Sequence, residues 1–156
     1  MKVADIIEEQ SNQSKIDPIS PDENGIYHLV ANDEHIIMLE NSLDEVGFFM
    51  YSVIGEINEQ ETQILYEILA DTLFDETNHT SISIDRDTSS LVLWQYFYNE
   101  TTSFAIYQQE LENFISVFEY WSNKASKYLL PEQHINSLKK QRLSLAPDQK
   151  MNIFLT

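Results

Sequence analysis

Several kinds of residue are scarce or missing in this 156-residue chain, and each absence excludes a class of protein. There is no cysteine, which excludes both a disulfide framework and a thiolate metal site. Three glycines are too few and too widely spaced for a phosphate-binding loop or a dinucleotide fingerprint. No apolar run approaches the roughly 20 residues that cross a bilayer, and the first residues contain no apolar signal core. We therefore expect a cytoplasmic protein.

Basic residues are also scarce, with nine Lys and Arg against 26 Asp and Glu and a net charge of −17. Residues 1–130 hold 24 acidic and five basic side chains, whereas residues 131–156 hold two acidic and four basic ones. A negative field repels phosphate backbones, so we expect no nucleic-acid partner. The same field can speed the encounter with a basic protein. The length predicts one domain, which we place at residues 1–130, and Pro131 begins a C-terminal extension, residues 131–156, in which we expect a short helix and a tail.

Catalytic and metal-binding motifs are missing as well. The sequence contains neither a GxSxG elbow nor an HExxH motif. His28 and His35 could meet across a hairpin and hold a metal, but histidines that face solvent or a partner explain them better. The segment Asp85-Arg86-Asp87 fits a hairpin turn better than a calcium loop, because no EF-hand spacing follows it. We expect no enzyme, no cofactor and no metal.

What the sequence does contain is clear hydrophobic periodicity, which predicts eight elements in the order α-β-β-β-α-β-β-α. The expected helices cover residues 3–14, 58–75 and 103–130, and the expected strands cover residues 26–31, 35–40, 46–54, 81–85 and 91–98. Helices grouped against a mostly antiparallel sheet make a two-layer α+β domain. Continuous apolarity over residues 46–54 predicts that both faces of that strand are covered.

The aromatic run at residues 94–98 indicates a surface with a function. Alternate residues of a strand face opposite sides, so Trp94, Tyr96 and Tyr98 share one face while Leu93 and Phe97 share the other. If the second pair packs on the helices, three large aromatic side chains face outward. Such a patch favours a protein interface, and a second covered core face is the alternative.

This order of elements resembles the class I type III secretion chaperones, the Tir-chaperone family, over residues 3–130. The matching segments are the first helix, the turn and strands PDENGIYHLVANDEHIIML, the strand end IGEI, the helix with Ile64-Leu65 and Ile68-Leu69, the hairpin SISIDRDTSSLVLWQYF and the last helix LENFISVFEYWSNKAS. The resemblance implies a homodimer that binds the N-terminal segment of secreted effectors, keeps it extended and needs no ATP. The extension after Pro131 has no clear counterpart in the family.

Two sets of site residues follow from this hypothesis. We expect an apolar effector-binding groove between the first helix and the first hairpin, with further contacts on the aromatic strand. The effector-binding set is Ile6, Ile7, Ile26, His28, Ile37, Leu39, Trp94 and Tyr96. Burial in the core is the alternative for the groove residues, and for Ile26 and Ile37 it is equally favoured. The expected dimer interface is Ile64, Leu65, Ile68, Leu69 and Ile82.

Two further interpretations stay open at the level of sequence. The strong negative charge would equally suit an acidic immunity or inhibitor protein that neutralises a basic toxin. The C-terminal extension carries apolar residues in MNIFLT, and we hypothesise that residues 132–156 lie against the domain and partly cover a cargo or interface patch. A mobile tail without consequence is the alternative.

Overall fold

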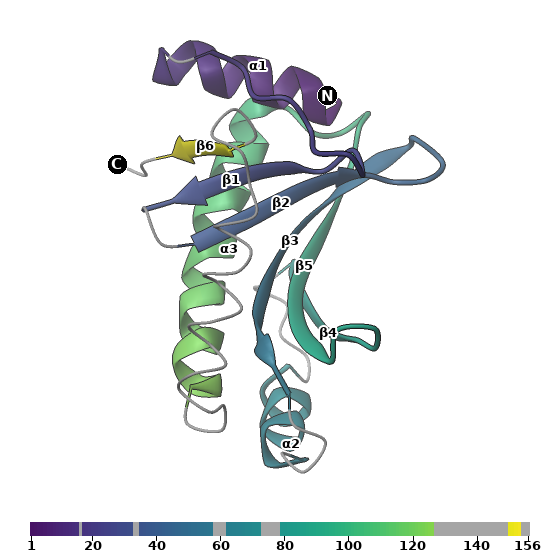
Figure 1. The fold of residues 1–156 in the computed structure, drawn as a ribbon, viewed down its shortest axis with the longest axis vertical. Helices are drawn as coiled ribbons and strands as arrows, with labels where there is room; N and C mark the ends of the chain where they lie inside the picture. The colour runs from purple at the N-terminus through teal and green to yellow at the C-terminus, as the bar shows by residue number, and fades with distance from the viewer. Residues whose placement is uncertain (16, 33–34, 58–61, 73–78, 127–149, 154–156) are drawn as a thin grey trace.

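The computed structural model describes residues 1–15, 17–32, 35–57, 62–72, 79–126 and 150–153. The elements along the chain are α1 (Val3–Ser14), β1 (Tyr27–Ala31), β2 (His35–Asn41), β3 (Gly47–Glu56), α2 (Thr62–Asp71), β4 (Ser81–Asp85), β5 (Ser90–Tyr98), α3 (Phe104–Ala125) and β6 (Lys150–Ile153). Up to α3 this order is the predicted one, and the two-layer α+β class is confirmed (Figure 1). The helix expected at residues 132–143 lies outside the described residues.

One mixed sheet organises the molecule, with the strand order β4-β5-β3-β2-β1-β6. The five predicted strands pair antiparallel, as expected for strands joined by short connections. The sixth strand, β6, pairs parallel with β1 and was not predicted. Because β6 comes from the far end of the sequence, the C-terminal region contributes directly to the sheet.

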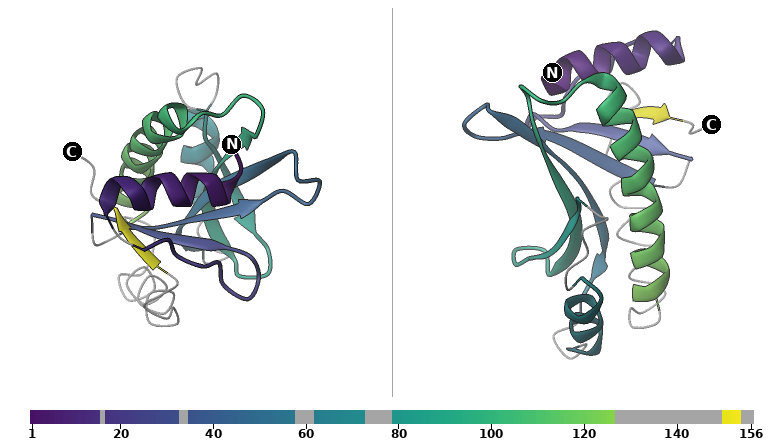
Figure 2. Two further views of the ribbon diagram at one scale, coloured as in Figure 1. Left: turned by 90° about the horizontal axis from the view of Figure 1, so that it is seen from above. Right: turned by 180° about the vertical axis from the view of Figure 1, so that it is seen from behind.

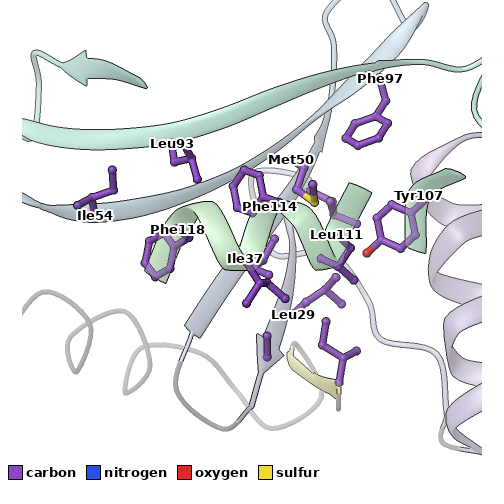
Figure 3. Close-up of a cluster of buried hydrophobic side chains, with 14 of the residues drawn as sticks. Leu29, Ile37, Met50, Ile54, Leu93, Phe97, Tyr107, Leu111, Phe114 and Phe118 are labelled. Carbon is purple, nitrogen blue, oxygen red and sulfur yellow. The ribbon is translucent and has the colours of Figure 1, made fainter. Parts of the chain in front are cut away.

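The core lies between α3 and one face of the sheet (Figure 3). Tyr107, Phe114 and Phe118 of α3 are at most 2% exposed, as the 3.6-residue periodicity of this helix requires. They meet inward-facing side chains of β5, including Leu93 and Phe97. The helix begins where predicted, because the Ser103 hydroxyl accepts a hydrogen bond from the Ile106 N–H at 3.3 Å and caps its first turn.

A charged cluster connects α2 to α3. Lys124 of α3 donates to Glu67 at 3.2 Å and also to Asp71, and the Tyr120 hydroxyl donates to Asp71 at 3.1 Å. The hydrogen bonds from Lys124 and then Tyr120 hold the pKa of Asp71 below its ordinary value, and the bond to Asp71 raises the pKa of Lys124. These contacts fix α2 at the end of the molecule, where β4 also lies (Figures 1 and 2).

Strand β3 corrects one prediction from the sequence. Phe48, Met50 and Ile54 are buried on the face toward α3, but Phe49 and Tyr51 on the opposite face are only half-buried. Among the described residues, the outer face of this strand is therefore only partly covered. A continuous apolar run does not distinguish a second core from a surface that carries aromatic side chains, because both place apolar residues at every position.

Candidate functional site

Aromatic side chains gather on the face of the sheet that points away from α3. We call this surface the aromatic face, and it consists of Phe49, Tyr51, Trp94, Tyr96 and Tyr98. The centre of the Phe49 ring lies 4.9 Å from that of Tyr96 and 6.0 Å from that of Trp94, and both pairs meet edge to face. The ring centres of Tyr96 and Tyr98 are 5.0 Å apart. The predicted outward orientation of Trp94, Tyr96 and Tyr98 is observed.

Hydrogen bonds hold two of these side chains in place. The Trp94 indole N–H donates to the Ser83 hydroxyl of β4 at 2.8 Å, and the Tyr51 hydroxyl donates to Glu40 of β2 at 3.0 Å. Burial, together with the negative charge of Glu40, raises the pKa of Tyr51, so this hydroxyl stays protonated and remains a donor. These two side chains are thus held before a partner arrives, which lowers the side-chain entropy that the aromatic face itself loses on binding.

A groove of about 550 Å³ runs along this face between the strands β2, β3, β5 and β4. Its lining combines apolar side chains with three carboxylates: Met38, Val53, Val92, Glu40, Glu56 and Asp85. Such a lining suits apolar side chains that are flanked by basic ones. Within the described parts of the chain, no group of three or more His, Asp or Glu side chains could hold a metal ion.

The groove that we expected between the first helix and the first hairpin is not present, which corrects the sequence-based prediction. Ile6 and Ile7 of α1 and Ile37 and Leu39 of β2 are at most 2% exposed and belong to the core. The amphipathic face of α1 packs into the core, and β6 lies between α1 and β1, so no open groove is left there (Figure 1). On the described surface these four side chains are therefore not available to an effector.

The other two expected groove residues lie at the start of β1. Ile26 is half-buried, and His28 is 8% exposed with its Nε2 atom 2.9 Å from an oxygen of Asp22. Burial favours the neutral form of Asp22, but hydrogen bonds from His28 and from the N–H groups of Ile26 and Asn24 outweigh it and lower the pKa of Asp22. His28 therefore has a structural contact, since it holds the turn that leads into β1.

The expected dimer residues divide in a similar way. Ile64 and Ile68 are buried in the core, whereas Leu65 and Ile82 are half-buried and Leu69 is 73% exposed. Sequence reasoning missed two exposed apolar side chains in the same region, Tyr66 of α2 and Ile84 of β4. The helical spacing in α2 indicated an apolar stripe, but it did not indicate which residues of the stripe would be buried in the core.

Strand β6 is the feature that sequence reasoning did not find. It pairs with β1 in parallel register, Leu29 beside Met151 and Ala31 beside Ile153, and the Asn32 N–H donates to the Ile153 carbonyl at 3.2 Å. Met151 and Ile153 are each 1% exposed within the core cluster. The alternation of apolar and polar residues at 151–153 was the available signal, but it spans too few residues to stand out.

None of the helices in the described segments combines the length and the apolarity that a membrane span requires.

Comparisons with solved structures find the same fold. The Yersinia pestis type III secretion chaperone SycH, solved with a stable fragment of YscM2, matches with a TM-score of 0.58 and 18% identity over 76% of this chain and 98% of that one. The ExsC–ExsE complex matches with a TM-score of 0.63 and 13% identity over 79% and 96%. The ExoU–SpcU complex of Pseudomonas aeruginosa matches with a TM-score of 0.60 and 10% identity over 78% and 95%. At these identities the likeness concerns the fold. No curated protein matches the chain by sequence.

The family model supplies the identity. The model of the Tir chaperone protein (CesT) family matches residues 5–122, which include α2, β1 to β5 and most of α1 and α3. This match confirms the resemblance to type III secretion chaperones. It also decides against the acidic immunity protein that the charge alone would have allowed. The chain belongs to the Tir chaperone protein (CesT) family.

Proposed function

We propose that this chain is a homodimeric, non-enzymatic chaperone of the cytoplasm, which binds an unfolded N-terminal segment of a type III secreted effector on the aromatic face. Membership of the Tir chaperone family supports the class of function. The observation that carries the choice of surface is the aromatic face itself, with five aromatic side chains that are not covered by the helices.

The chemistry of this face suits an extended segment. Trp and Tyr side chains bury a large area at a low cost in conformational entropy, and they contribute most of the binding energy in many interfaces. The carboxylates Glu40, Glu56 and Asp85 line the same groove and favour basic residues beside the apolar anchors. An unfolded segment loses conformational freedom on binding, so it must cover a large surface. We therefore expect a bound segment to extend beyond the groove.

The open end of the sheet supports the proposed dimer. Strand β4 is the last strand of the order at this side, and Ile84 on it is 47% exposed. Leu69 and Tyr66 of α2 are also exposed at this end of the molecule (Figure 1). A two-fold interface buries the same patch on both subunits, so one patch of exposed apolar side chains is sufficient. The revised dimer set is therefore Leu65, Tyr66, Leu69, Ile82 and Ile84.

Membership of the Tir chaperone family supports a role without catalysis. Holding a segment extended needs binding energy alone, because the chaperone releases no product and changes no covalent bond. The solved complexes of similar folds, such as SycH with a fragment of YscM2, support the same kind of role.

The test is a comparison of two variants in the source bacterium. Trp94→Ser removes the central side chain of the aromatic face, whereas Ile106→Ser removes a 46% exposed side chain on α3, on the other side of the sheet. We expect both proteins to fold, and the first to lose at least about tenfold in affinity for a co-purified type III effector. The complex of the unchanged protein should persist at high salt, since apolar contacts hold it. Equal affinity of both variants would place the effector elsewhere.

A further inference from the structure

Strand β6 differs from the other strands in how it joins the sheet. Each of the others pairs with a strand that runs antiparallel to it, whereas β6 runs parallel to β1 and is reached only after residues 126–149. It is four residues long and forms the border of the sheet beside β1 (Figure 1). A strand in this position covers an edge whose N–H and C=O groups would otherwise be open to another chain.

The contacts of β6 define what the edge of β1 accepts. Met151 lies beside Leu29 and Ile153 beside Ala31, and both tail side chains are 1% exposed. They belong to the same core cluster as Val3 and Ile7 of α1, and β6 lies between α1 and β1 (Figures 1 and 2). We call the position that β6 occupies the slot. The slot therefore takes an extended segment with two apolar side chains two residues apart, in an orientation parallel to β1.

We propose that β6 is an internal placeholder: residues 150–153 occupy a strand-accepting slot at the β1 edge, and an effector segment with the pattern apolar-x-apolar displaces them. This inference rests on the proposed function, and it adds a second contact region and a regulatory step to it. The main-chain bonds that β6 makes, such as Asn32 N–H to the Ile153 carbonyl, are independent of sequence and can be made by any extended segment. The side-chain positions of Met151 and Ile153 then provide the selectivity.

The placeholder protects the free chaperone and selects its cargo. An uncovered apolar edge invites pairing with other chains and aggregation, and β6 prevents this while no effector is bound. A tail on the same chain competes with an effective concentration in the millimolar range, so a weak segment cannot replace it. A segment that binds the β1 slot and the aromatic face together gains contacts that β6 does not make. A segment that contacts the slot alone displaces the tail only when its concentration approaches the millimolar range.

The natural absence of cysteine allows a direct test on the full-length chain. Ala31→Cys with Ile153→Cys places two thiols at register partners on adjacent strands, which lie about 4.8 Å apart and within the range that a disulfide spans. The probe is a fluorescent peptide with the sequence of residues 148–156. We expect the reduced protein to bind this peptide at least about tenfold more tightly than the oxidised protein, and reductant to restore binding. The control protein with Ile153→Cys alone has no second thiol on the adjacent strand, so it should bind the peptide equally with and without reductant.

A second variant keeps the test decisive if the cysteine pair disturbs the core. Met151→Asp with Ile153→Asp in the full-length chain should release its own tail and bind the unchanged peptide at least about tenfold more tightly than the unaltered chain does. A peptide that carries the same two substitutions should not bind. Equal peptide affinity of this variant and the unaltered chain would overturn the placeholder. No effector enters this peptide assay, so its failure would not change the conclusion from the Trp94→Ser variant. A failed effector assay would in turn not change the conclusion about the slot.

Discussion

The two edges of the sheet end in different ways. At one edge β6 covers β1, and its side chains Met151 and Ile153 are buried. At the other edge β4 has no further strand beside it within the described residues, and Ile84 is 47% exposed. Edge strands are exposed to unwanted pairing, so a protein must cover them or use them. The difference agrees with the two proposed uses, in which the chain itself covers the β1 edge and a second subunit covers the β4 edge.

The energetics of the covered edge agree with a strand that can leave. Burial of Met151 and Ile153 contributes about 1.5–3 kcal/mol each. Ordering the backbone of four residues costs roughly 1–2 kcal/mol per residue. The two terms are of similar size, and net hydrogen bonding adds only about 0.5–1.5 kcal/mol per bond. Strand β6 is thus held weakly. Strand β1 differs, because β2 and β6 pair with it on its two sides and its buried side chains share the core with those of α3.

The largest expected effect separates β1 from β6. Leu29→Ala and Met151→Ala remove side chains that lie side by side and are 0% and 1% exposed. We expect Leu29→Ala to lower the free energy of unfolding by about 2–5 kcal/mol, as for a core leucine. Met151→Ala should lower the free energy of unfolding by less, because the loss cannot exceed the free energy that docking of β6 contributes. Urea unfolding at pH 7 measures both, and equal losses would show that β6 is a permanent part of the core.

The next effect concerns the open edge. We expect the unchanged protein to have twice the chain mass of 18.2 kDa in light scattering at micromolar concentration. Leu69→Glu with Ile84→Glu places two pairs of like charges across the proposed two-fold interface and should give the monomer mass. Leu43→Glu changes another fully exposed leucine, in the turn between β2 and β3, and should leave the dimer intact. A dimer that survives the double substitution would move the interface away from α2 and β4.

A smaller effect concerns the turn before β1. Asp22→Ala removes the hydrogen bonds to His28 and to the N–H groups of Asn24 and Ile26, and we expect a loss of about 1–3 kcal/mol at pH 7. The pKa of Asp22 is lower in the folded state than its ordinary value of 3.8, so its contribution is fully present above that value. The contribution is lost as the pH falls through the lower, folded pKa. The two proteins should therefore become equally stable in acid, and a difference that grows in acid would contradict this assignment.

The sequence predicted those parts of the molecule in which local patterns and packing agree. Helix α3 and strand β5 each have a long apolar period, so their first residues and their buried faces followed from it to within one residue, and Trp94 and Tyr96 were placed on the outer face. The end of α3 was predicted too late, because the helix ends at Ala125 and not at residue 130. The pattern of α1 showed that Ile6 and Ile7 share a face but not which surface that face meets. It meets the core, which is why the expected groove is absent.

Strand β6 could not be predicted for a related reason. Four residues carry too short a period, and the decisive fact is a pairing with β1 more than a hundred residues earlier in the chain. The charge and apolar content of residues 131–156 only suggested that this region could lie against the domain. Burial of Met151 in a slot between α1 and β1 depends on tertiary geometry that one sequence does not show.

The central claim is that an effector segment takes the place of β6. Hydrogen exchange of the full-length protein, followed by NMR alone and with the N-terminal segment of a co-purifying effector, tests it most directly. The Asn32 amide, which donates to the Ile153 carbonyl, should stay protected in both states, because an incoming strand replaces the bond. The amides of Met151 and Ile153, which face β1 in this parallel register, should be protected in the free protein and exchange rapidly in the complex. Protection of these two amides that persists in the complex would contradict the account.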